Sequence, residues 1–110
     1  SNRLLIDQEF SIDSNYSIAP LILLTMVENM FKHGVEKTTG KAILKIKINA
    51  TKGKFCMLTE NTFEPQSHSE HGIGLKNVRQ QLQLIYPARH QIESKEIGSI
   101  YRTQLKINLT

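Results

Sequence analysis

The 110-residue chain has no tryptophan, a single cysteine and no long uninterrupted apolar run. One cysteine, Cys56, cannot form an intrachain disulfide or a thiolate metal cluster, and its apolar neighbours predict an inert thiol in the core. The longest apolar run, residues 18–24, is too short to span a bilayer and contains Pro20. No charged segment followed by an apolar one opens the chain, so we expect no secretory signal.

The composition is typical of one globular domain covering residues 1–110, with 39% hydrophobic and 22% charged residues. Ser1 and Asn2 are interpreted as the remnant of a removed tag. Basic residues outnumber acidic ones by 14 to 10, a formal net charge of +4. This excess mildly favours an anionic partner. Because aromatic residues are few and basic runs are short, a nucleic-acid surface has no further support, and a phosphorylated small molecule fits equally well.

Hydrophobic periodicity and turn residues predict two helices and about five strands. The predicted helices cover residues 18–35 and 74–86, the latter from Leu75, Val78, Leu82 and Ile85 at helical spacing. The predicted strands cover residues 3–12, 41–50, 54–61, 90–97 and 99–109, and a polar loop covers residues 62–72. The expected fold is α+β, a two-layer α/β sandwich whose mixed sheet carries its helices on one face.

A polar stripe runs along the otherwise apolar first helix. Its members follow helical spacing and share one face: Thr25, Glu28, Asn29, Lys32 and His33. Carboxylate and amide oxygens suit Mg²⁺, and cations suit a triphosphate. The stripe is equally well explained as the solvated side of a core helix, with Glu28 and Lys32 forming an ordinary surface ion pair.

Two glycines, Gly72 and Gly74, stand at the start of the second predicted helix. Glycine there allows positive φ and close backbone approach, and a helix N-terminus presents free N–H groups to an anion. Taken alone, such a pair is more often a turn and an N-cap region than a phosphate cradle.

Taken together and in this order, two segments resemble motifs of sensor histidine kinases. IAPLILLTMVENMFKHG resembles the N-box and GIGLKNVRQQLQLIYP the G-box, both most similar to the LytS/YehU-like branch. The resemblance implies the Bergerat ATP-binding fold shared by histidine kinases, gyrase, MutL and heat-shock chaperones. It also implies ATP and Mg²⁺ as cofactors.

The resemblance implies a role for each matching residue of the first helix. Asn29 would coordinate Mg²⁺ through its amide oxygen, and Glu28 would be the paired acid that ligates the metal or a water. Lys32 and His33 match positions that face the phosphates. By the same match, Thr25 stands where ATP-hydrolysing relatives carry a glutamate base, which a kinase does not need.

The second motif and two strands supply the other implied site residues. Gly72 and Gly74 match the lid hinge, with Leu75 packing below and Asn77 near the phosphates. Asn61 matches the position of the aspartate that binds the adenine amino group, and Thr103 lies near a threonine beside the adenine. Two departures stand out, because Asn61 replaces that aspartate and Gln81 replaces a usual arginine.

The resemblance also implies the reaction and the partners. We expect the catalytic domain of a two-component kinase, which delivers the γ-phosphoryl of Mg-ATP to a histidine in upstream dimerisation helices. A response regulator, a homodimeric parent and no nucleic acid are the expected partners, with this domain on the cytoplasmic side of an inner-membrane protein. One alternative is a degenerate nucleotide-binding or docking module without phosphotransfer. Another is a basic nucleic-acid adaptor.

Overall fold

The computed structural model describes residues 4–12, 17–34, 40–63 and 71–110. The elements, in chain order, are β1 (Leu4–Ile12), α1 (Pro20–Gly34), β2 (Ala42–Thr51), β3 (Lys54–Thr62), α2 (His71–Ile85), β4 (His90–Ile97) and β5 (Ile100–Asn108). This succession of two helices and five strands confirms the predicted α+β class.

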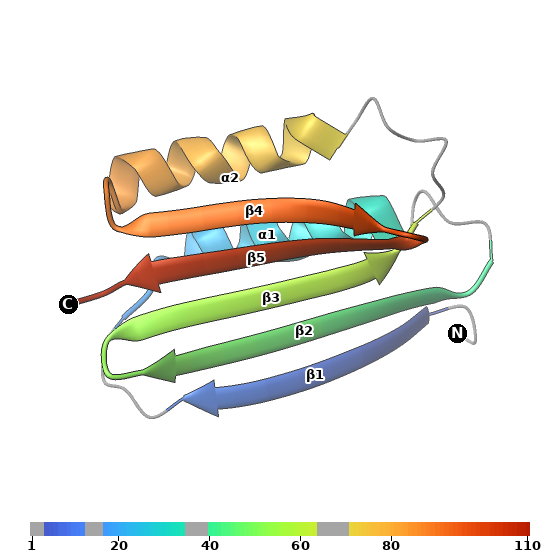
Figure 1. Ribbon diagram of the computed structural model, residues 1–110, viewed down its shortest axis with the longest axis horizontal. Coiled ribbons are helices and arrows are strands. Elements are labelled where there is room, and N and C mark those ends of the chain that lie inside the picture. The colour runs from blue at the N-terminus through green and yellow to red at the C-terminus, as the bar shows by residue number, and fades with distance from the viewer. Residues whose placement is uncertain (1–3, 13–16, 35–39, 64–70) are drawn as a thin grey trace.

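The five strands form one mixed sheet in the order β1-β2-β3-β5-β4 (Figure 1). Strand β1 pairs with β2 in parallel, and the other three pairings are antiparallel. The β2–β3 hairpin turns through Lys52 and Gly53, whose φ angles of 53° and 74° match the type I′ turn that suits twisted strands. Gly98, at φ 60°, begins the tight turn between β4 and β5.

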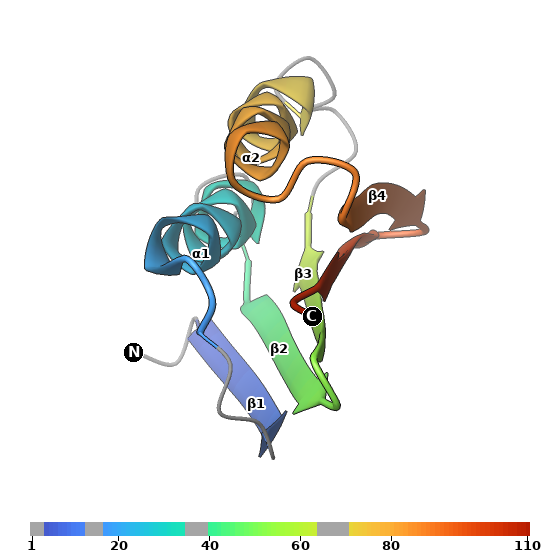
Figure 2. The same ribbon diagram turned by 90° about the vertical axis from the view of Figure 1, so that its left-hand side faces the viewer.

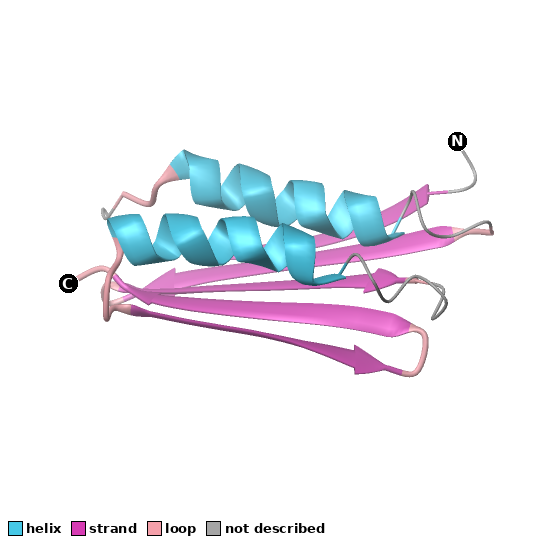
Figure 3. Cartoon of the chain, turned by 90° about the horizontal axis from the view of Figure 1, so that it is seen from above, coloured by secondary structure: helices cyan, strands magenta, loops and turns pink. Residues whose placement is uncertain are grey.

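Both helices lie on the same face of the sheet and run antiparallel to each other (Figures 2 and 3). Helix α1 packs against β2, β3 and α2. Pro20 is its first residue, where the missing N–H is harmless. The backbone N–H of Ala19 donates to the Tyr86 hydroxyl at 3.0 Å, which ties the start of α1 to the end of α2.

An apolar core fills the layer between the helices and one end of the sheet. Helix α1 supplies Ile22 and Met26, and α2 supplies Val78 and Leu82. The sheet supplies the inward-facing side chains Ala50, Phe55, Met57, Leu105 and Ile107. Cross-strand register places Phe55 opposite Ile107 and Met57 opposite Leu105, so these apolar pairs stack in rows across β3 and β5.

Three details differ from the sequence prediction. Helix α2 begins at His71 rather than at residue 74, so Gly72 and Gly74 lie within its first turn. The backbone N–H groups of a first turn have no hydrogen-bond acceptor within the helix. Ile85 is 43% exposed and Tyr86 is buried in its place, because Tyr86 continues the four-residue spacing from Leu82. Cys56 is only half-buried, since strand alternation points it to the helix-free face while Phe55 and Met57 enter the core.

Candidate functional site

The inward-facing rows of β3 and β5 change from apolar to polar halfway along the strands. Thr59 lies opposite Thr103, and Asn61 lies opposite Tyr101. Thr59, Asn61 and Thr103 are 3%, 1% and 1% exposed, so they are buried as deeply as the apolar core. We call this half of the layer, defined by Asn29, Thr59, Asn61 and Thr103, the polar end.

Helix α1 brings Asn29 to the polar end. The helix runs in the same direction as β3 (Figure 1), and Ile22 and Met26 pack in the cluster that contains Met57. Asn29 follows Met26 by three residues on the same helix face, so it lies further toward the end of β3. Its side chain is 5% exposed. The first turn of α2 lies at this end of the molecule as well.

Two oxygen atoms of the polar end are buried without a hydrogen-bond partner among the described residues: Asn29 Oδ1 and Thr103 Oγ1. Gln81 Oε1 on α2 is in the same state. Each such atom costs about 1–3 kcal/mol of desolvation free energy. Buried acceptors of this kind are uncommon in folded proteins, and they are the groups that a bound ligand or ion can satisfy.

The side-chain amide of Asn61 is held in one orientation. Its Nδ2 donates to the carbonyl oxygen of Thr62 at 3.1 Å. A carbonyl can only accept, so the nitrogen must lie on that side and the oxygen on the other. No described donor reaches Asn61 Oδ1. The amide therefore presents an acceptor, as the aspartate expected at this position would.

The residues of the polar stripe on α1 differ in how deeply they are buried. Asn29 is buried, Lys32 is half-buried and Glu28 is exposed. The Thr25 hydroxyl donates to the Leu21 carbonyl at 2.9 Å, within the helix. Among the described residues, Glu28 and Lys32 form no ion pair, so the surface-pair interpretation of the stripe is not supported.

The residues expected from the second motif are only partly brought together. Leu75 is buried on α2, 3% exposed. Asn77 is exposed on α2 and does not join the buried polar side chains. The side chains of His33 and residues 71–74, and all of residues 64–70 from the expected lid, lie outside the described residues.

Two residues at the polar end were not singled out from the sequence as members of the site. Tyr101 and Phe63 are both 3% exposed, and their rings meet edge to face with centroids 6.2 Å apart. The Phe63 backbone N–H donates to the Ser99 carbonyl at 3.0 Å, which fixes the chain just beyond β3. Tyr101 shares the alternation of Thr103, Leu105 and Ile107 along β5, and that alternation is a signal that could have found it.

The described residues hold no group of three or more His, Cys, Asp or Glu side chains that could bind a metal by themselves. A magnesium ion here would therefore depend on oxygen atoms such as Asn29 Oδ1 together with oxygens of a ligand. No described helix has the length and apolar character needed to cross a membrane.

Known structures resemble this chain closely in fold. The blue-light activated histidine kinase EL346 of Erythrobacter litoralis superposes with a TM-score of 0.71 at 12% identity, over 99% of this chain and 36% of that one. The chain has the fold of a histidine kinase catalytic domain. The histidine kinase AdeS of Acinetobacter baumannii gives 0.68 at 13% identity, over 99% of this chain and 56% of that one.

The catalytic domain of the histidine kinase ThkA gives a TM-score of 0.62 at 17% identity, over 96% of this chain and 80% of that domain. The chain thus covers about four fifths of an isolated catalytic domain but only 36% and 56% of the two longer kinases. No family model and no curated protein matches the sequence. The LytS/YehU-like branch therefore stays a prediction.

Proposed function

We propose that this chain is the ATP-binding catalytic domain of a sensor histidine kinase. It would deliver the γ-phosphoryl of Mg-ATP to a histidine in dimerisation helices outside residues 1–110. The observation that carries the proposal is the polar end, where Asn29 Oδ1 and Thr103 Oγ1 are buried without partners among the described residues. In a fold typical of these kinases, unpaired buried oxygen atoms are better explained as ligands of a nucleotide and its metal than as part of an apolar core.

The polar end, together with Lys32, would supply the groups that hold Mg-ATP. Asn29 would hold the ion through its amide oxygen, and half-buried Lys32 would neutralise phosphate charge. Asn61 Oδ1 would accept from the adenine amino group, and Thr103 would lie beside the base. When bound, Mg²⁺ supplies charge neutralisation for phosphoryl transfer. The chain's own residues bind and orient the nucleotide and keep water from the base.

Further parts of the proposal concern the parent protein. The structure of ThkA in complex with the response regulator TrrA motivates a response regulator as a partner of this chain too. The parent would be a homodimer in the inner membrane, with this domain on the cytoplasmic side. Glu28 and Asn77, both exposed, would act through water.

A transfer assay tests the proposed reaction. Incubation of the chain with γ-labelled ATP should leave it unlabelled. Addition of the parent's helical phosphoacceptor region should lead to labelling of a histidine in that region. Stable phosphohistidine on residues 1–110 would show that the acceptor has been misplaced, and no labelling of either part would remove the kinase assignment.

A second candidate is a degenerate module that binds nucleotide without transfer, and Asn61 is the observation that favours it. A neutral amide accepts a weaker hydrogen bond than a carboxylate, by about 1 kcal/mol or roughly fivefold in affinity. Weak ATP binding, with a Kd on the order of 10⁻⁴ M, is therefore expected.

The substitution Asn61→Asp should tighten ATP binding about fivefold and increase discrimination against GTP, since a carboxylate repels the guanine carbonyl. Because Nδ2 is held by Thr62, the native amide already presents oxygen, so some preference for ATP over GTP is expected before substitution. Titration of both nucleotides measures the ratio. A change in stability with an unchanged ratio would remove Asn61 from the site.

A further inference from the structure

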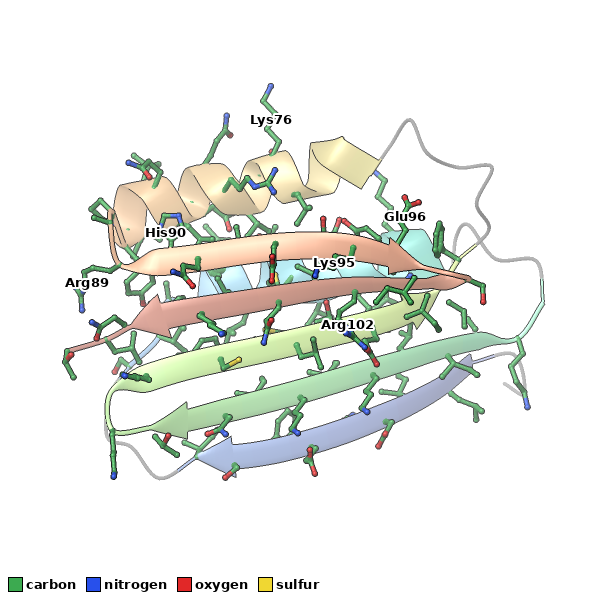
Figure 4. The ribbon with its side chains drawn as sticks, viewed as in Figure 1. Lys76, Arg89, His90, Lys95, Glu96 and Arg102 are labelled. Atoms are coloured by element: carbon green, nitrogen blue, oxygen red, sulfur yellow. The ribbon has the colours of Figure 1, made fainter. Side chains whose placement is uncertain are left out.

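A groove of about 600 Å³ opens at the end of the sheet opposite the polar end. Its lining includes the basic residues Lys54, Arg89, His90 and Lys106, and we call it the basic groove. Figure 4 shows Arg89 and His90 where α2 leads into β4. Lys54 and Asn61 stand seven residues apart on β3, so the basic groove lies about 23 Å from the polar end.

Strand register brings the two lysines together. Lys106 lies opposite Cys56 on β3 and opposite Gln91 on β4. Lys54 is two residues before Cys56 and therefore occupies the diagonal position, about 7–8 Å away on the same helix-free face. Like charges this close destabilise a sheet unless water or a counterion compensates them.

The turn between α2 and β4 adds Arg89 to the two lysines. The Arg89 carbonyl accepts from Asn108 N–H at 2.8 Å, and its guanidinium donates to the Thr110 carbonyl at 3.2 Å. His90 lies opposite the core residue Ile107, so its ring is on the helix-facing side of the sheet, where Nδ1 donates to the Tyr86 carbonyl at 2.7 Å. These bonds fix both residues beside the end of β5.

Among the described residues, no acidic side chain lines the basic groove. The other polar side chains around it are neutral and include Gln91 and Asn108. Among the described residues, no carboxylate forms an ion pair with Lys54, Arg89 or Lys106. Glu93, two residues beyond Gln91, lines an adjoining hollow of about 210 Å³ that Gln91 and Lys106 also line, and it is diagonal to Lys106 on the helix-free face, as Lys54 is. By contrast, Arg102 and Lys47 on the same face are paired with Glu60 and Glu9.

We propose that the basic groove binds a compact multivalent phosphate anion, of which pyrophosphate is the simplest example. Lysine and arginine together suit phosphate, because the lysine ammonium is a compact point charge and the planar arginine guanidinium can donate two parallel hydrogen bonds. Two lysines and an arginine around one groove favour concentrated charge over the spaced carboxylates of an acidic peptide. A volume of about 600 Å³ is within the range of small-molecule sites and exceeds what one inorganic phosphate would fill. The proposal does not depend on nucleotide binding at the polar end.

The test is a titration of the ¹⁵N-labelled chain with pyrophosphate, without magnesium, followed by backbone amide chemical shifts. The largest shifts are expected at residues 53–56, 88–91 and 106–108. The double substitution Lys54→Gln/Lys106→Gln should weaken binding at least tenfold. The matched control Lys41→Gln/Lys45→Gln removes two exposed charges elsewhere and should stay within twofold of the native chain. Thermal melting confirms that each variant is folded.

Three results would overturn the proposal. One is a largest shift at residues 29, 59–61 and 103, which would place pyrophosphate at the polar end. Another is equal weakening in both double variants, which would mean diffuse attraction by net charge. The last is an affinity for a glutamate-rich peptide of equal charge that matches the affinity for pyrophosphate. That result would indicate an acidic protein partner.

Discussion

The two ends of the layer between helices and sheet differ in the chemistry of their buried side chains. At one end, Phe55 and Met57 face Ile107 and Leu105 across the sheet, and Tyr86 closes the layer by accepting from Ala19 N–H. At the other, the same strands carry threonine, asparagine and tyrosine in the same inward rows. Burial is similar at both ends, but at the polar end two buried oxygen atoms lack a hydrogen-bond partner among the described residues.

This difference separates stability from binding within one small domain. The apolar end gains free energy by removing hydrocarbon from water. The polar end keeps Asn29 Oδ1 and Thr103 Oγ1 desolvated without partners among the described residues, which costs free energy until a ligand supplies them. Removing apolar volume at the apolar end should therefore lower stability, whereas replacing an unpaired polar atom at the polar end with an apolar group of similar shape should raise it.

The largest expected effect is at the apolar end. Leu105 is fully buried in the core cluster, so Leu105→Ala should lower the free energy of unfolding by about 2–5 kcal/mol. Urea denaturation measures it. A loss below 1 kcal/mol would mean that this end does not hold the fold.

A smaller loss is expected where the apolar end is closed. Tyr86→Phe removes the acceptor for Ala19 N–H and should cost about 1–2 kcal/mol in the free energy of unfolding. ATP affinity should change by less than twofold, because the bond is at the far end from Asn29. A clear loss of ATP affinity without loss of stability would contradict the separation of the two ends.

The smallest effect, and one of opposite sign, is expected at the polar end. Thr103→Val replaces a buried hydroxyl that lacks a described partner with a methyl group of similar shape. The free energy of unfolding should rise by about 1 kcal/mol. ATP binding should weaken in the same variant. Thr51→Val, on a half-buried strand-end residue outside the layer, serves as the control and should leave ATP binding unchanged.

The fold could be predicted from the sequence where the pattern was regular. The alternation from Tyr101 to Ile107 and the helical spacing of Leu75, Val78 and Leu82 both correspond to buried faces. Cys56 was assigned to the wrong face because a run of apolar residues hides the period of two. Only the pairing register shows which side of the sheet each member of such a run occupies.

The site could be predicted only in part for a related reason. Helical spacing groups Glu28 with Asn29, yet successive residues differ by about 100° around a helix, and packing decides which one turns inward. The burial of Asn29 and the exposure of Glu28 follow from the contact of α1 with β3 and α2. The orientation of the Asn61 amide depends on the Thr62 carbonyl, which no sequence pattern reveals.

The central claim, that the polar end is a Mg-ATP site, is tested most directly by calorimetric titration of ATP with and without magnesium. In the native chain, magnesium should strengthen ATP binding. Asn29→Ala should weaken ATP binding and abolish the magnesium dependence, while the melting temperature without ligand barely changes, since Asn29 makes no described side-chain hydrogen bond. Asn49→Ala, on the exposed face of β2, should retain the native response. An unchanged magnesium response in Asn29→Ala would contradict the account.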